Sequence, residues 1–153
     1  MLRSDLPIAL PCALYSGYAD AQGIDMDGAT GDKAFFQIPF RCQVVLAGVV
    51  VTEVCAGSST TPVVKFDLRP TAGSDTDRGD GDIANLVLST TAAGKVMYDE
   101  DAVGDVLEPG EEVVVELATA AVGGSPTGHV RPFLLVEYLP ETLANLSDMV
   151  ETA

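Results

Sequence analysis

Residues 42–55, Cys-Gln-Val-Val-Leu-Ala-Gly-Val-Val-Val-Thr-Glu-Val-Cys, form a long run that is nearly all apolar. Its valines and the branched Thr52 favour a β-strand over a helix, because branched side chains lose rotamer freedom in a helix. The run is apolar at odd and even positions alike, which predicts a strand covered on both faces or a central strand at a subunit contact. Gly48 within the run indicates a β-bulge or the close approach of another backbone.

Strand patterns surround this run on both sides. Residues 63–68 alternate, with Val64, Phe66 and Leu68 on one face, which predicts a half-buried strand. Residues 108–111, Glu-Pro-Gly-Glu, carry proline and glycine at the positions that a type II turn prefers. Further short strands are expected at 35–38, 83–88, 95–98, 113–117 and 130–138. Strands of this length, joined by closely spaced turns, predict an all-β fold, an antiparallel β-sandwich or jelly-roll-like domain.

The chain is most simply one domain with two extensions. Its 153 residues are enough for a single hydrophobic core. Residues 34–140 carry the strand patterns and are assigned to the β-sandwich. Residues 1–33 show no sustained period and are expected to form an extended N-terminal arm, and residues 141–153 form a short C-terminal tail whose apolar spacing fits a short helix or a second arm.

The arm contains an uncharged stretch, residues 6–18, Leu-Pro-Ile-Ala-Leu-Pro-Cys-Ala-Leu-Tyr-Ser-Gly-Tyr. Asp5 directly precedes this stretch and two prolines interrupt it, so the N-terminal region makes a poor signal peptide. An apolar segment without a regular period needs cover, either from a partner or from its own domain, and both alternatives stay open. If a partner supplies the cover, we expect a chain without residues 1–33 to fold but to lose that partner. The candidate partner-binding residues are Leu6, Ile8, Leu10, Leu14, Tyr15 and Tyr18.

The chain is strongly acidic, with 23 Asp and Glu against 8 Lys and Arg and a formal charge of -15. This charge repels phosphate backbones and anionic lipids, so neither nucleic acid nor a membrane is an expected partner. A basic or neutral protein surface fits better. Carboxylates are densest at 99–116, where they are expected to form a solvent-facing rim. No apolar stretch is long enough to span a bilayer, so the chain is expected to be soluble and made in the cytoplasm.

The cysteines indicate a reducing compartment. Cys12, Cys42 and Cys55 are odd in number and have no CxxC spacing. Cys42 and Cys55 lie at the two ends of the valine-rich run and are expected to be buried thiols that behave as small hydrophobic side chains.

The sequence offers little catalytic material. His129 is the single histidine and follows a glycine-rich loop, which favours a surface histidine over a catalytic one. No nucleophile elbow, zinc-protease motif or phosphate-binding loop occurs, so neither an enzymatic activity nor a cofactor is expected. One turn rich in carboxylates is a weak candidate for calcium, although its spacing does not fit the helix-loop-helix calcium motif. The carboxylates of this turn belong to Asp75, Asp77, Asp80 and Asp82.

Four segments, 49–53, 64–70, 107–113 and 133–138, combine valine-rich strands with a Leu-Glu-Pro-Gly-Glu turn. This combination, within residues 34–140, resembles the capsid decoration or cement proteins, which are small β-sandwich structural proteins of tailed-bacteriophage head modules. The resemblance implies a homotrimer on the outside of the virion capsid that stabilises contacts between major capsid subunits, with a terminal arm reinforcing those contacts. It implies synthesis in the host cytoplasm, and it carries no family-defined binding residues.

Two other classes of function stay open. One is a ligand-binding or receptor-binding β-module of a phage fibre or spike, for which the aspartate turn would suit calcium-dependent binding. The other is a trimeric β-type enzyme such as a nucleotide hydrolase, which fits least because no phosphate-binding loop with nearby basic residues occurs. We therefore predict a non-enzymatic structural protein whose partners are the major capsid protein and further copies of itself.

Overall fold

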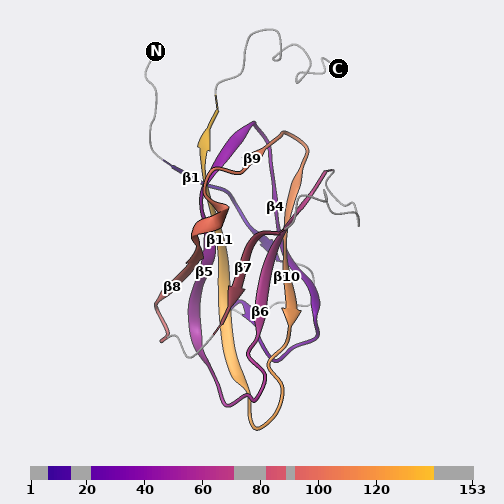
Figure 1. The fold of residues 1–153 in the computed structure, drawn as a ribbon, viewed down its shortest axis with the longest axis vertical. Coiled ribbons are helices and arrows are strands. Elements are labelled where there is room, and N and C mark those ends of the chain that lie inside the picture. The colour runs from indigo at the N-terminus through magenta and orange to yellow at the C-terminus, as the bar shows by residue number, and fades with distance from the viewer. Residues whose placement is uncertain (1–6, 15–21, 71–81, 89–91, 140–153) are drawn as a thin grey trace.

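The computed structural model describes residues 7–14, 22–70, 82–88 and 92–139. These residues form two antiparallel β-sheets that pack face to face (Figure 1). The described ranges also contain one 3₁₀ turn, η1 (Glu100–Ala102), and no α-helix. The prediction of an all-β, sandwich-like fold is confirmed.

The first sheet, named sheet A, is built around the valine-rich run. That run is β5 (Cys42–Ala56), which pairs along most of its length with β11 (Thr127–Tyr138). The strand order is β1-β11-β5-β8, so β5 and β11 are central. The shorter strands of sheet A are β1 (Ile8–Ala9) and β3 (Ile24–Asp25) beside β11, and β8 (Val96–Asp99) and β9 (Val106–Leu107) beside β5.

The second sheet, named sheet B, has the strand order β2-β4-β10-β6-β7. Its strands are β2 (Ala13–Leu14), β4 (Gly31–Gln37), β6 (Val63–Arg69), β7 (Asp82–Val87) and β10 (Glu112–Thr119). The alternation predicted for 63–68 is confirmed in β6, where Val64, Phe66 and Leu68 are buried. The turn before β10 is confirmed as well, because Gly110 has φ 86° and the Glu111 amide donates to the Glu108 carbonyl oxygen at 3.2 Å.

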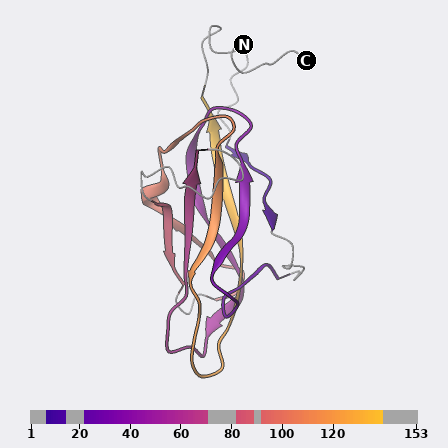
Figure 2. The ribbon, with the colours of Figure 1, turned by 90° about the vertical axis from the view of Figure 1, so that its right-hand side faces the viewer.

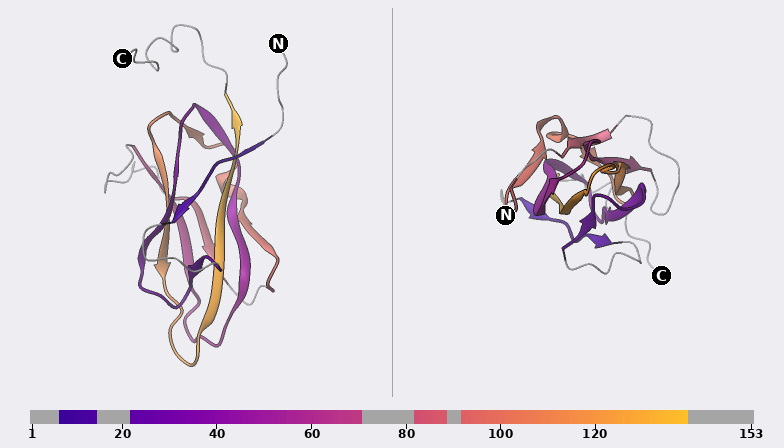
Figure 3. Two further views of the ribbon diagram at one scale, coloured as in Figure 1. Left: turned by 180° about the vertical axis from the view of Figure 1, so that it is seen from behind. Right: turned by 90° about the horizontal axis from the view of Figure 1, so that it is seen from below.

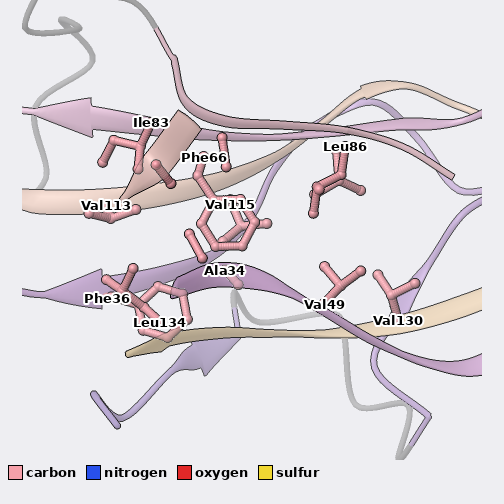
Figure 4. Packing of buried hydrophobic residues seen from close by; sticks show 14 of the residues in the cluster. Ala34, Phe36, Val49, Phe66, Ile83, Leu86, Val113, Val115, Val130 and Leu134 are labelled. Carbon is pink, nitrogen blue, oxygen red and sulfur yellow. The ribbon is translucent and has the colours of Figure 1, made fainter. Parts of the chain in front are cut away.

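The hydrophobic core lies between the two sheets. Phe36 of β4 and Phe66 of β6 stack with their ring centroids 6.3 Å apart. Val49 of β5 and Leu134 of β11 face them from sheet A (Figure 4). All four side chains have an exposed fraction of 0%. Burial of a side chain of this size stabilises the fold by about 1.5–3 kcal/mol.

The N-terminal segment crosses from one sheet to the other. β1 pairs with β11 of sheet A, and β2 then pairs with β4 of sheet B, so residues 8–14 close one side of the sandwich (Figure 3). This segment lies on the side opposite to η1 (Figure 2). On the side of η1, the edge strands β7 and β8 meet, and the backbone amide of Asn85 donates a hydrogen bond to Asp99 Oδ2 at 2.8 Å.

The described part of residues 1–33 therefore folds back on its own domain. Leu10 is only 7% exposed, and Ile24 and Met26 are fully buried in the core. The expected boundary after residue 33 falls inside β4, which begins at Gly31. The expectation that a chain lacking residues 1–33 still folds does not agree with this arrangement, because the deletion removes core side chains and three strands.

Candidate interaction surfaces

The outer face of sheet A, turned away from the core, is apolar at its centre. Directly paired residues in an antiparallel sheet project to the same face. Leu135 pairs with Leu46, and Val50 pairs with Val96. Phe133 and Tyr98 flank Gly48 on its two sides. Val96 and Tyr98 are 51% and 49% exposed, and the other side chains are half-buried. We call this surface the apolar face, made of Val45, Leu46, Val50, Val96, Tyr98, Phe133 and Leu135.

A β-bulge places two consecutive apolar side chains on the apolar face. Leu135 pairs with Leu46 but Val136 pairs with Val44, so Val45 is an extra residue in β5. Val44 and Ala47 are buried whereas Val45 and Leu46 are half-buried. A bulge of this kind puts two residues of one strand opposite one of its partner. The run is apolar at odd and even positions alike because both sides of β5 carry apolar residues. The side chains on one side fill the core, and those on the other form the apolar face.

Gly48 marks a close backbone approach, which was one of its two predicted roles. A Cβ atom at this position would lie 2.2 Å from the Met97 carbonyl oxygen and 2.9 Å from the Tyr98 Cα. The register shifts of β5 fall near Val45 and Thr52 and not at Gly48. Glycine at this position therefore lets β8 lie against β5 and brings Tyr98 onto the apolar face.

The outer face of sheet B is charged and ion-paired. Lys65 of β6 pairs with Glu116 of β10, which in turn pairs with Asp32 of β4. Lys65 Nζ lies 2.8 Å from Asp82 Oδ2, and Arg69 Nη2 lies 2.9 Å from Asp32 Oδ2. The pKa of Asp82 is lowered by its hydrogen bond with Asp67 and by Lys65, and Asp82 in turn raises the pKa of Lys65. Not all of this face is open to water, since Arg69 is 8% exposed and Val114 is fully buried. The two outer faces differ in chemistry, because one is apolar at its centre and the other carries paired charges.

His129 lies between carboxylates at one end of the outer face of sheet A. It pairs in register with Glu53 and Asp25. Its Nδ1 is hydrogen-bonded to Glu53 Oε2, and its Nε2 lies 4.0 Å from Asp25 Oδ1. The side chain is on the outer face but only 13% exposed, so it is a half-buried histidine held by carboxylates. These contacts bind the ring to the sheet, and a signal for them was the lone acidic residue, Glu53, within the apolar run.

The acidic region at 99–116 is only partly the solvent-facing rim that was expected. Glu100, Asp101 and Asp105 are exposed. Glu111 and Glu112, in contrast, are buried, with exposed fractions of 8% and 3%. The Glu111 carboxylate accepts a hydrogen bond from the Glu108 amide at 2.7 Å, which is a structural role within the turn.

Of the aspartate turn, only Asp82 belongs to the described residues. Its carboxylate is engaged with Lys65. Asp75, Asp77 and Asp80 lie outside the described residues. Within the ranges that the structure describes, no group of three or more His, Cys, Asp or Glu side chains is arranged to hold a metal ion.

The arm residues proposed to bind a partner have different surroundings. Leu6, Tyr15 and Tyr18 lie outside the described residues, and Leu14 belongs to β2. Leu10 is buried against the core of its own domain, so it cannot contact a partner in this fold. Ile8, at 42% exposed, is the member of the set with a described and exposed side chain.

Ile8 belongs to a small apolar cluster where both described chain ends lie. Ile8 pairs with Val136, so Pro7 and Leu139 lie at the same end of the sandwich (Figure 1). Tyr138 is 46% exposed and packs edge-on against Phe40, with ring centroids 5.8 Å apart. We call Ile8, Phe40 and Tyr138 the terminal cluster. The loop between β10 and β11, which contains Val122, lies at the opposite end of the sandwich.

A shallow open depression lies beside the N-terminal segment. Pro11, Cys12, Phe35 and Gln37 line it, and its volume is about 170 Å³. Sites for small molecules usually measure about 300–1,000 Å³ and are enclosed. This depression is therefore too small and too open to resemble such a site.

The cysteines agree with the prediction of thiols without disulfides. Cys12, Cys42 and Cys55 form no disulfide; Cys42 and Cys55 are buried, whereas Cys12 is exposed. The pKa of Cys42 is raised to about 11, mainly by burial and to a smaller extent by the negative charges of Glu108 and Glu111. Buried thiols of high pKa are inert, so these two cysteines serve the core and not chemistry.

Among the described residues, no helix is long and apolar enough to cross a membrane. Comparison of the chain with models of protein families, with curated proteins and with solved structures finds no match. The surfaces described above are therefore the basis for inferring what this protein does.

Proposed function

We propose that this chain is a non-enzymatic structural protein that binds the outside of a protein shell and stabilises contacts between the shell subunits. The resemblance to decoration proteins suggests that the shell is the capsid of a tailed phage. The observation that supports this proposal is the contrast between the apolar face of sheet A and the ion-paired outer face of sheet B.

An apolar face of this kind favours protein contact over catalysis. Contiguous apolar surface is uncommon on monomeric proteins and marks sites of association. The aromatic side chains of Phe133 and Tyr98 belong to the class that contributes most at protein interfaces. The ion pairs of Lys65 and Arg69 neutralise charges of sheet B within the chain itself. A protein with one apolar outer face and one outer face of paired charges suits a structural role at a surface.

The terminal cluster is the proposed contact with the shell. Ile8 and Tyr138 are both exposed there, and the chain leaves the described sandwich at this end in both directions. An aromatic side chain beside an aliphatic one provides a compact anchor for a pocket on another protein. The charge of -15 favours a basic or neutral shell surface around that pocket.

Co-sedimentation with capsids that lack the protein tests the proposal. The variants Ile8→Asp and Tyr138→Asp place a charge in the terminal cluster and are expected to weaken binding by about 10-fold or more, since a desolvated charge in an interface costs at least about 1.4 kcal/mol. Val122→Asp is the matched control, because Val122 is 59% exposed and lies at the opposite end. Failure of the unaltered chain to bind capsids of its own phage would overturn the proposal.

A control shows whether the terminal cluster itself is the contact. If the unaltered chain binds capsids and all three variants bind equally well, the protein is still a shell-binding protein but the contact lies elsewhere. Circular dichroism of each variant verifies that the β-fold is intact, since these side chains are exposed and their replacement leaves the core unchanged.

A further inference from the structure

We propose that a helix of a different protein covers the apolar face, and that this helix has an apolar stripe with basic side chains towards both of its ends. The chemistry of this partner follows from the apolar face and the charges around it. Its identity rests on the proposed function, which makes the partner a subunit of the shell. The apolar face is then a second contact with the shell, beside the terminal cluster.

The apolar face offers a partner side chains and not backbone groups. The backbone amides and carbonyls of β5 and β11 lie in the plane of sheet A, where the two strands pair over eleven residue pairs. An added strand needs free backbone groups and therefore binds at a sheet edge. A partner on a face is instead a second sheet or a helix, because the backbone of either is already hydrogen-bonded.

The width of the apolar face favours a helix over a second sheet. Only β5 and β11 run along its whole length. β8 and β9 lie beside β5, and β1 and β3 lie beside β11, but each over four residue pairs or fewer and at different levels. At the usual spacing of strands, the face is therefore about 10–14 Å wide. A helix with its side chains is about 10–12 Å across, so one helix covers the face.

Carboxylates lie at both ends of the apolar face. At one end, Glu53 and Asp25 lie on either side of His129, which is hydrogen-bonded to Glu53. At the other end lies Glu137 of β11, which is half-buried and forms no ion pair with the residues that the structure describes. Arg131, between the two ends, already has a partner within its own chain. The free charge that this face offers to a partner is therefore negative.

This distribution of charge favours a basic partner over a second copy of the chain. Arg41, which precedes β5 near Glu137, does not change it, because Arg41 Nε lies 3.0 Å from Glu108 Oε1. Two facing copies would oppose carboxylates at their ends in either direction, and each copy has a formal charge of -15. The ends of the face, at His129 and Glu137, are about 27 Å apart at the usual rise of a strand. A helix of about 18 residues spans this length.

A synthetic peptide tests the chemistry of the partner. The probe is a fluorescently labelled helical peptide of about 18 residues with a leucine stripe and lysines near both ends. The control peptide has glutamates in place of the lysines. By fluorescence anisotropy at low salt, we expect the full chain to bind the lysine peptide at least about 10-fold more tightly than the control, and more weakly as the salt concentration rises. Equal binding of the two peptides overturns the inference, as does binding of neither.

Two variants with matched controls test whether the apolar face is the site. Val50→Asn puts a polar group at its centre and is expected to weaken binding of the lysine peptide by about 10-fold. Glu137→Gln removes a charge at its end and is expected to weaken binding by about 3-fold. The controls are Val63→Asn and Glu116→Gln, which change a half-buried valine and a half-buried glutamate on the outer face of sheet B. Controls as weak as their counterparts overturn the inference.

The mass of the full chain, measured by analytical ultracentrifugation, tests a second copy as the occupant. We expect Val50→Asn to leave this mass unchanged. A mass of several copies that Val50→Asn reduces to one would show that further copies cover the apolar face, and it would overturn the inference.

These outcomes are separable from those of the capsid experiment. Capsid binding that Val50→Asn and Glu137→Gln leave unchanged refutes a shell subunit as the partner of the apolar face and leaves the proposed function standing. Binding of the lysine peptide at the apolar face, by a chain that never binds capsids, refutes the proposed function and leaves the chemistry of the partner standing.

Discussion

Phe133 of β11 lies directly opposite Gly48 of β5, on the side of sheet A that faces away from the core. Across Gly48, the next strand contributes Tyr98. Because Gly48 has no side chain, Phe133 and Tyr98 lie on either side of it on this outer face. Antiparallel sheets commonly present polar residues on a face that is turned to solvent. This arrangement places two aromatic side chains on the outer face of sheet A, which favours contact with a partner there.

Replacement of Gly48 tests the packing of β8. In Gly48→Ala the new methyl group clashes with the Met97 carbonyl oxygen. Because this oxygen is a backbone atom, the clash is relieved only if β8 moves. We expect the free energy of unfolding to fall by about 1–3 kcal/mol, as for overpacking elsewhere. Urea unfolding measures this change. A stability equal to that of the unaltered chain would show that β8 does not lie against β5 as described.

Deletion of residues 1–33 tests the role of the N-terminal segment. The deletion removes Ile24 and Met26 from the core, and the loss of one large buried side chain alone costs about 2–5 kcal/mol. We expect this chain to be unfolded by circular dichroism. Deletion of residues 1–6 is the control, because it keeps β1 and should leave the fold intact. A folded chain after the longer deletion would contradict the assignment of this segment to the sandwich.

The ion pair of Lys65 with Asp82 predicts how stability depends on pH. Asp82 has a lowered pKa, so its contribution is present above the unfolded value of about 3.9 and is lost as the pH falls through the lower folded pKa. Lys65 has a raised pKa, so its contribution is present below about 10.4 and is lost as the pH rises through the higher folded pKa.

The variant Lys65→Met removes this pair. Both side chains are about one-third exposed, so we expect a loss of at most about 1 kcal/mol at neutral pH. The loss should shrink below the pKa of Asp82, and a double-mutant cycle with Asp82→Asn isolates the contribution of the pair. An equal loss at all pH values would mean that Lys65 acts through packing and not through its charge.

The three thiols should differ in reactivity. Cys12 is exposed, although it lines the shallow depression and desolvation there raises its pKa to about 11, so we expect slow but measurable reaction with a thiol reagent. Cys42 and Cys55 are buried and should react only when the sandwich opens. Cys12→Ser should therefore abolish the labelling of the native protein, whereas guanidinium should expose two remaining thiols. Rapid labelling of Cys12→Ser in its native state would contradict the burial of both.

The sequence was sufficient for the long strands but not for the short ones. The valines of 42–55 and the alternation at 63–68 predict β5 and β6, because branched side chains and a period of two are local properties. β1, β2 and β3 each contain two residues, which is too short for a period. Their place depends on pairing with β4 and β11, a tertiary property that no local pattern contains.

The candidate surface could be predicted only in part. Apolar residues at both parities of β5 indicate a second covered face, but the bulge at Val45 depends on the register with β11. The contact between His129 and Glu53 joins residues 76 positions apart in the chain, so spacing could not predict it. The burial of Leu10 could not be predicted either, because it also depends on contacts with residues far away in the chain. From the sequence alone, an apolar residue near a terminus fits a partner surface as well as a core.

The central claim is that the apolar face is covered when the protein is in its assembled state. Hydroxyl-radical footprinting measures this directly, by comparison of the oxidation of Tyr98 and Phe133 in dilute and concentrated solution and on capsids. We predict several-fold protection of both residues on assembly, with no change at Phe35 on the outer side of sheet B. Oxidation of Tyr98 and Phe133 that is the same in every state would contradict the claim.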